Sequence, residues 1–202
     1  MKLIDCLACL LKPDDACMYC NKDLCSSHKR LHLPFCHEDK PMGCDIHPYL
    51  EVKFKGQRWA EIGSIDPGRD YSLFGYMAGV RTSSPLGYEP KGFPTDASWE
   101  ILSAYTLVVT EVNTDLGYRV EKSTAEKWVA SGSSVFISKE SYGGTADRVS
   151  GPDWHSASWL DAGELSKIQE GYPNITTKAI IAILKAYESE GYEARIVFWF
   201  DN

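Results

Sequence analysis

The sequence contains no long apolar run, and this absence excludes one class of protein. None of its 202 residues belongs to a stretch of the roughly 18 consecutive apolar residues that a membrane-spanning helix requires. The apolar opening of the chain is also too brief for a secretory signal, and Asp5 interrupts it. We therefore expect a cytoplasmic protein that makes no contact with membranes.

Basic charge is scarce over most of the chain. The formal net charge is −7, and residues 1–41 are balanced, with six basic and six acidic side chains. Residues 42–202 hold 15 basic against 22 acidic side chains, which accounts for the whole imbalance. Because affinity for nucleic-acid phosphates comes mainly from Lys and Arg, this second segment is a poor general binder of nucleic acid. A local basic patch is still compatible with this charge balance.

Cysteine is almost absent after residue 36. Six of the seven Cys lie before residue 37, and three of the five His lie within the same first 37 residues. Disulfide pairing belongs to secreted proteins, and the chain carries no adequate secretory signal. Metal binding explains the cluster better.

The first 41 residues contain eight metal ligands in closely spaced pairs. Two Cys-x2-Cys pairs, one Cys-x2-His pair and one His-x3-Cys pair are enough for two tetrahedral zinc sites. The short gaps favour a cross-brace in which alternate pairs share an ion. A segment this short holds too little apolar material to fold unaided, so zinc would supply its folding energy. One predicted site consists of Cys6, Cys9, Cys25 and His28, and the other of Cys17, Cys20, His32 and Cys36, with His37 as the alternative to Cys36 or His32.

The run CMYCNKDLCSSHKRLH, residues 17–32, resembles the two-zinc finger of stress-associated proteins, the AN-one type, and more loosely a B-box. The resemblance covers most of residues 6–36. It implies a module that docks on a macromolecule, usually a protein, and does not catalyse a reaction. Closed Cys/His coordination agrees with this, because a catalytic zinc keeps an open position.

Charges, a Pro and a Gly in residues 37–43 mark a boundary, which divides the chain into domains 1–41 and 42–202. In the second domain, strands and helices are mixed without a repeating strand–helix–strand order. This pattern predicts an α+β fold with a mixed, mainly antiparallel sheet. Strands are expected at 44–54, 57–63, 106–112, 118–122, 133–140 and 194–200, helices at 69–80, 97–105, 123–132, 161–170 and 176–191, a long loop at 82–98 and irregular structure at 141–158. The helix at 123–132 carries a capping-box pattern in Ser123 and Glu126.

Two Asp-x-His pairs, Asp45–His47 and Asp153–His155, are the main candidates for chemistry. Residues i and i+2 of an extended segment share a face, so each Asp can lie beside its His. Three interpretations stay open. The pairs converge as a metal site that activates water; each Asp orients a His for acid–base work or ligand binding; or both His are ordinary half-buried residues. Cys44 points to the face opposite His47, so we expect it to be buried and not a nucleophile.

Aromatic and polar side chains near these pairs are candidate ligand contacts. Aromatic rings can stack on a base or sugar, and the two arginines that bracket the helix at 69–80 can clamp a phosphate or carboxylate. The expected ligand-binding residues are Tyr49, Arg69, Arg81, Trp154, Ser156, Ser158 and Trp159.

Three segments of the second domain resemble an uncharacterised group of phage and bacterial proteins. They are Met42–His47, the Arg-x-Tyr-x-Leu-Phe motif of residues 69–74, and His155–Trp159. The sequence departs from that group at Ala157, where a second His is expected, and this departure argues against a metal there. The resemblance implies that the finger was added to a domain found alone elsewhere. It carries no activity with it.

These observations favour a phage-derived, zinc-binding interaction protein. Its finger would dock on a host protein, and its α+β domain would hold a small polar or nucleotide-like ligand, so as to sequester a signal or inhibit a defence or regulatory factor. One alternative is a metal-dependent phosphoester hydrolase that uses Asp45, His47, Asp153 and His155. Another is an acidic surface that blocks the nucleic-acid channel of a partner.

Overall fold

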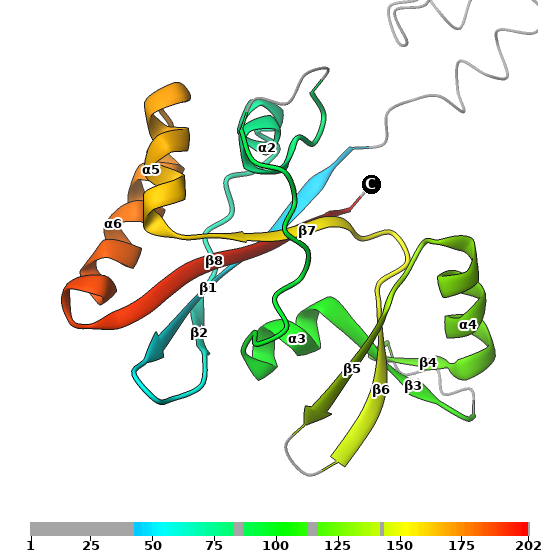
Figure 1. Cartoon of the computed structure of the whole chain (residues 1–202). Coiled ribbons are helices and arrows are strands. Elements are labelled where there is room, and N and C mark those ends of the chain that lie inside the picture. The colour runs from blue at the N-terminus through cyan, green and yellow to red at the C-terminus, as the bar shows by residue number, and fades with distance from the viewer. Residues whose placement is uncertain (1–42, 83–86, 113–116, 142–143, 202) are drawn as a thin grey trace, which may run out of the picture. The chain divides into compact units, whose positions relative to one another are not determined.

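The computed structural model describes residues 43–82, 87–112, 117–141 and 144–201 (Figure 1). The eight predicted zinc ligands lie outside these residues, so the two-zinc site stays a prediction. The described part of the chain combines five helices with two mostly antiparallel sheets, which confirms the α+β prediction for this part. None of its helices has the length and apolar character needed to cross a membrane.

The first sheet is built around two long strands that are far apart in the sequence. These central strands pair antiparallel over ten residues each, from Asp45 opposite Asp201 to Phe54 opposite Tyr192. The apolar run ARIVFWF is buried throughout, which confirms its predicted central position. In spatial order the strands are β2 (Ala60–Gly63), β1 (Asp45–Phe54), β8 (Tyr192–Asp201) and β7 (His155–Leu160).

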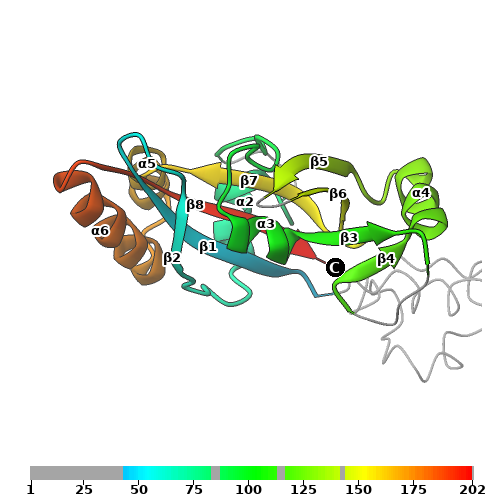
Figure 2. The ribbon, with the colours of Figure 1, turned by 90° about the horizontal axis from the view of Figure 1, so that it is seen from below.

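The second sheet is shorter and lies beside one end of the first (Figure 2). Its outer face is covered by α4 (Lys122–Ser131), through a small core of Val120, Ala125 and Val149. Helix α3 (Trp99–Tyr105) leads directly into β3 (Thr106–Thr110) of this sheet, so a short helix joins the two sheets along the chain. In spatial order the strands are β4 (Arg119–Glu121), β3 (Thr106–Thr110), β6 (Gly144–Ser150) and β5 (Phe136–Ser141), with β3 and β4 parallel.

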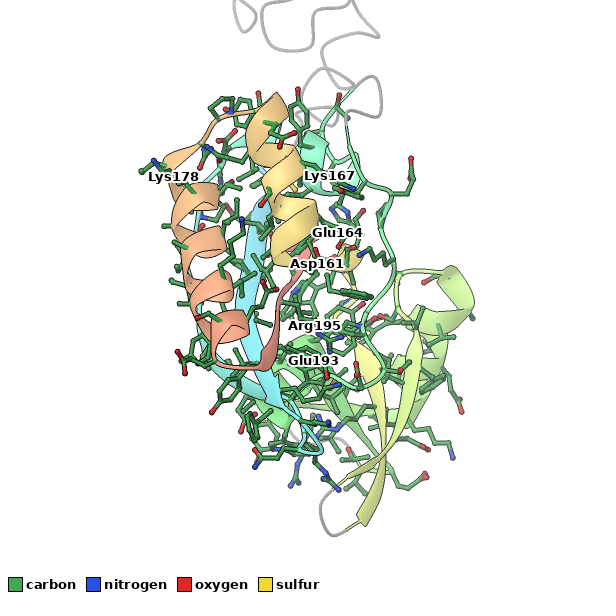
Figure 3. The ribbon with its side chains drawn as sticks, turned by 60° about the vertical axis from the view of Figure 1, so that its left-hand side comes forward. Asp161, Glu164, Lys167, Lys178, Glu193 and Arg195 are labelled. Atoms are coloured by element: carbon green, nitrogen blue, oxygen red, sulfur yellow. The ribbon has the colours of Figure 1, made fainter. Side chains whose placement is uncertain are left out.

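Three helices cover one face of the first sheet: α2 (Tyr71–Ala78), α5 (Ala162–Gly171) and α6 (Ile175–Ser189) (Figure 3). Each begins at a side chain that accepts hydrogen bonds from the first turn, namely Asp70, Asp161 and Asn174. Asp161 and Glu164 form a reciprocal capping box at the start of α5. These caps fix where the helices begin and hence which residues face the sheet.

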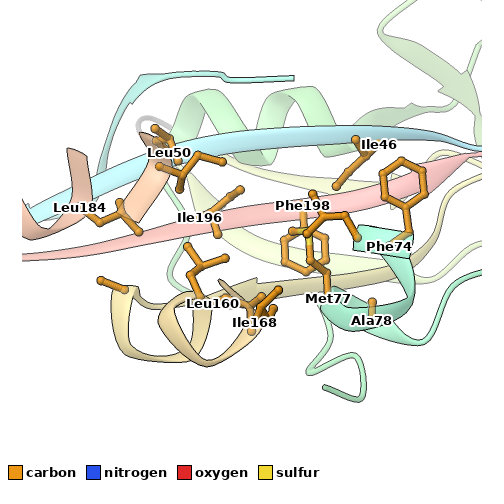
Figure 4. Close-up of a cluster of buried hydrophobic side chains, with 14 of the residues drawn as sticks. Ile46, Leu50, Phe74, Met77, Ala78, Leu160, Ile168, Leu184, Ile196 and Phe198 are labelled. Atoms are coloured by element: carbon orange, nitrogen blue, oxygen red, sulfur yellow. The ribbon is translucent and has the colours of Figure 1, made fainter. Parts of the chain in front are cut away.

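The main core lies between these helices and the sheet (Figure 4). Alternate residues of β1 and β8, such as Ile46 and Phe198, point toward Phe74 and Met77 of α2 and Leu184 of α6. Burying a side chain of this size contributes about 1.5–3 kcal/mol to the free energy of folding. Cys44 belongs to the same core and is fully buried, as expected from its position in the strand.

Two local predictions are wrong. The stretch 141–158, expected to be irregular, contains β6 and the first part of β7. Helix α4 has no capping box, because it begins at Lys122 directly after β4 and the side chain of Glu121 makes no cap hydrogen bond.

Candidate functional site

The face of the first sheet opposite the helices carries a cluster of aromatic rings. Trp199 is at its centre and lies opposite His47 in the register of β1 and β8. The rings of His47 and Tyr49 stack on Trp199 with centroids 5.5 and 5.1 Å away, and Trp154 lies 5.4 Å from it. Tyr105 meets the same indole edge-on at 5.1 Å. The alternation of β1 and β8 thus separates an aliphatic face from an aromatic one.

An open cavity of about 670 Å³ lies next to this cluster. Its walls come from the loop before α3, from the start of β5 with the turn before it, and from the segment that leads into β7. Val135 and Phe136 are 56% and 47% exposed and add apolar surface to this wall. The lining residues are Pro90, Gly92, Phe93, Thr95, Tyr105, Gly132, Ser133, Ser134, Val135, Phe136, Ile137, Ser150, Trp154, His155, Ser156 and Ala157.

Stacked rings make up much of the apolar lining. Phe93 and Tyr105 are nearly parallel, with centroids 4.1 Å apart and planes inclined by 4°. Trp154 continues the stack at 5.6 Å from Tyr105. Burial raises the pKa of Tyr105, against the opposing effect of a hydrogen bond with Ser150, so this phenol stays neutral at physiological pH. The lining therefore offers flat, uncharged surface.

Serine hydroxyls supply most of the polar groups in the cavity. The Ser134 side chain is buried, and its Oγ has no hydrogen-bond partner within the described residues. The Oγ of Ser150 accepts a hydrogen bond from the Val135 amide at 3.1 Å, and Ser156 Oγ lies 3.0 Å from His155 Nδ1. A buried hydroxyl without a partner costs about 1–3 kcal/mol, so Ser134 is a group that a ligand can satisfy.

A β-bulge shapes the side of the cavity formed by β7. The register with β8 shifts between His155 and Ser158. Within the shift, Ser156 has a backbone φ of 51°, a value that residues other than glycine rarely adopt. The extra residue places the His155 ring 6.0 Å from Phe200, whereas Ala157 packs with the aromatic cluster. Backbone strain of this kind costs of order 1–3 kcal/mol and is concentrated at functional sites.

The first Asp-x-His pair has partners other than those expected. His47 Nε2 lies 3.1 Å from Asp201 Oδ2, across the strand pair. The carboxylate of Asp45 instead accepts two hydrogen bonds from Arg69, at 2.6 and 2.8 Å. This bidentate contact lowers the pKa of Asp45. Asp201, which β8 places opposite Asp45, was not recognisable as a site residue from the sequence.

The two Asp-x-His pairs do not form a common metal centre in the region described. His47 contacts the rings of Trp199 and Trp154, whereas His155 lies against Phe200, and Asp153 is exposed. Across residues 43–82, 87–112, 117–141 and 144–201, no three His, Cys, Asp or Glu side chains are arranged to hold a metal ion.

The other predicted ligand contacts divide between the cavity and its surroundings. Trp154 and Ser156 line the cavity. Ser158 is fully buried and accepts a hydrogen bond from the Lys91 amide, while Trp159 lies under the Lys91 ammonium at 3.8 Å. Arg81 is placed beside the buried Cys44, whose thiol pKa is raised by burial and lowered less strongly by Arg81.

Phe93, Tyr105, Ser134 and Ser150 were missed as site residues by reasoning from the sequence. The composition of the loop at 82–98 and the SGSS run at 131–134 were the local signals available. Neither signal indicates that these segments meet, because the contact depends on the packing of two sheets.

No family model, curated protein or solved structure matches this chain. The geometry of the cavity is therefore the basis for assigning a function.

Proposed function

We propose that residues 43–201 form a metal-independent binding domain for a small polar ligand with a flat, nucleotide-like ring. The observation that carries this proposal is the open cavity, which is lined both by stacked rings and by Ser134, a hydroxyl without a hydrogen-bond partner in the described part of the chain. Small-molecule sites are concave, mostly apolar and about 300–1,000 Å³ in volume, with a few polar groups that fix the orientation of the ligand. The cavity has each of these properties.

The ring wall and the hydroxyls have separate roles in this proposal. Phe93, Tyr105 and Trp154 provide stacking surface, which is worth about 1–3 kcal/mol per base. Ser134 and Ser156, with His155 beside them, supply hydrogen bonds that distinguish one ring from another. The ligand would be recognised by its shape and its polar edge.

The preceding finger would bind two zinc ions and dock the protein on a host protein in the cytoplasm. The spacing of its Cys and His residues supports this part of the proposal. A cavity for a small molecule in a chain that also carries a docking module suits a phage-derived protein that sequesters a host signal or inhibits a defence or regulatory factor. The metal-dependent hydrolase is less well supported, because Asp45 is held by Arg69 and His47 by Asp201.

The stacking role of Phe93 is tested by titrating the full chain with a panel of nucleosides and nucleotides in a calorimeter. Phe93→Leu removes a ring from the cavity wall and should weaken binding by about 5- to 150-fold, the equivalent of one lost stacking contact. Ser134→Ala should also weaken binding, without lowering stability, because the hydroxyl has no hydrogen-bond partner among the described residues to lose.

The matched control is Phe54→Leu. Phe54 is 42% exposed at the far end of β1, where its ring packs on Tyr192 and lines no part of the cavity. Binding by this variant should equal that of the unaltered protein. Equal losses in Phe93→Leu and Phe54→Leu, or a panel in which nothing binds, would contradict the proposal.

A further inference from the structure

Arg148 in β6 is a buried guanidinium without a carboxylate partner among the described residues. It is 6% exposed, and its Nη1 donates one hydrogen bond to Thr106 Oγ1 at 3.0 Å. Its Nε has no hydrogen-bond partner in the same part of the chain. Its guanidinium carbon also lies 4.5 Å from the centroid of the Trp99 ring.

The other buried arginine shows how this fold normally neutralises such a charge. Arg195 is equally buried, but it bonds to Glu51 at 2.7 Å and to Asp96 at 2.8 Å. Buried charges in proteins are almost always paired, because an isolated ion loses its hydration without compensation. Burial accordingly lowers the pKa of Arg148. Arg148 therefore has the bonding capacity for an anion that the described residues do not supply.

The strand register makes Arg148 a neighbour of two residues that line the cavity, although its own side chain is not part of the lining. Val149 faces α4, so its neighbours Arg148 and Ser150 lie on the opposite face of β6. Ser150 lines the cavity, and so does Ile137, the residue directly opposite Arg148 on β5. Two residues along a strand span about 7 Å, which is the scale of the step from a ring to a group attached to it.

We infer that Arg148 binds an anionic group, a phosphate or a carboxylate, attached to the aromatic ring that occupies the cavity. This rests on the proposed function and specifies its ligand as an aromatic anion. The planar guanidinium offers parallel N–H donors that match either group in a bidentate contact. The buried charge is then compensated when the ligand is bound, as Glu51 compensates Arg195.

The test uses pairs of probes that share a ring and differ in charge. Adenosine is compared with adenosine 5′-monophosphate, and 3-methylindole with indole-3-acetate, by calorimetry on the full chain. We expect the charged member of at least one pair to bind ten-fold or more tightly than the neutral one, and the pair that responds identifies phosphate or carboxylate. In Arg148→Met this preference should disappear.

Arg148→Met should also leave the ligand-free protein as heat-stable as before, or more so, because it removes an uncompensated buried charge. The control is Arg119→Met, an exposed arginine of the same sheet, which should change neither measurement. If Arg148→Met fails to fold, Arg148→Lys retains the charge without the bidentate geometry and should reduce the preference for the charged probe.

Each outcome of these measurements either supports or overturns the anion-binding role of Arg148. Equal binding of both members of every pair, unchanged in Arg148→Met, would overturn it and leave the proposed function standing. A large loss of stability in ligand-free Arg148→Met would assign the arginine a structural role instead. If no ring binds, the proposed function fails, and the anion site is then tested with inorganic phosphate alone. A rise in the thermal unfolding temperature of the unaltered protein, but not of Arg148→Met, supports an anion site. No rise in either protein refutes it.

Discussion

At the scale of single residues, the fold treats its two buried arginines in opposite ways. Arg195 lies between the rings of Trp59 and Trp159, and its guanidinium bonds to Glu51, whose second oxygen accepts the Ser98 amide at the start of α3. Arg148 has no comparable acid in the described region. The first arginine holds α3 against the sheet, and the second is available to a ligand.

Arg195→Met should therefore destabilise the domain by about 3–5 kcal/mol, because it leaves Glu51 buried and unpaired. Urea unfolding followed by tryptophan fluorescence measures this loss, since all six Trp lie between residues 59 and 199. Adding Glu51→Met should recover much of the stability.

A surface ion pair provides the control for Arg195→Met. Lys53 and Glu193 are 3.0 Å apart, but their side chains are 25% and 62% exposed. Exposed pairs contribute about 0–1 kcal/mol, so Lys53→Met should change the free energy of unfolding by no more than that. An Arg195→Met variant as mildly affected as Lys53→Met would show that the buried pair does not hold the fold together.

At the scale of elements, Asp161 and Ser123 both resemble helix N-caps in the sequence, but only Asp161 caps a helix. Asp161 accepts the amide of Glu164 at 2.8 Å and Glu164 bonds back to the Asp161 amide, whereas Ser123 lies inside α4 and bonds to Glu121. Asp161→Ala should lower the free energy of unfolding by about 1 kcal/mol, and Ser123→Ala by less than about 0.5 kcal/mol. Thermal unfolding of the two variants measures the difference. Equal shifts would mean that the capping box at Asp161 contributes nothing to stability.

Elements were predictable where local chemistry alone determines them. Helices α5 and α6 carry a side-chain cap and an apolar stripe, and β8 is an apolar run, so each was placed to within a few residues. Strands β6 and β7 were hidden, because Gly, Ser and Asp interrupt their sequence and Pro152 lies between them. Their pairing with β5 and β8 overrides those residues, and the bulge at Ser156 accommodates one of the interruptions.

At the scale of the whole molecule, the candidate site was only partly predictable. Trp154, His155 and Ser156 were recognised because unusual residues gather in one short segment. Phe93 and Tyr105 come from other segments that reach the cavity through the packing of the second sheet, and no local pattern reports that packing. Asp201 was missed for the same reason, since its partner His47 is 154 residues away.

The division of roles between finger and binding domain predicts the metal content of the full chain. We expect two zinc ions per molecule by elemental analysis, fewer in Cys17→Ser and the same number in His155→Ala. Chelation should leave the tryptophan-monitored unfolding transition nearly unchanged, because the described residues hold no metal cluster. A third metal that is lost in His155→Ala would restore the hydrolase as the leading hypothesis.

The pairing of β1 with β8 also sets the order of events during synthesis. Roughly 140 residues separate the end of β1 from the start of β8, and all ten residues of β1 pair with β8. At a translation rate of about 5–20 residues per second, β1 leaves the ribosome roughly 7–30 seconds before its main partner exists. During that interval its aliphatic face and strand edge are open to wrong partners. The nascent chain thus has a built-in waiting time, in which dependence on holding chaperones should be greatest.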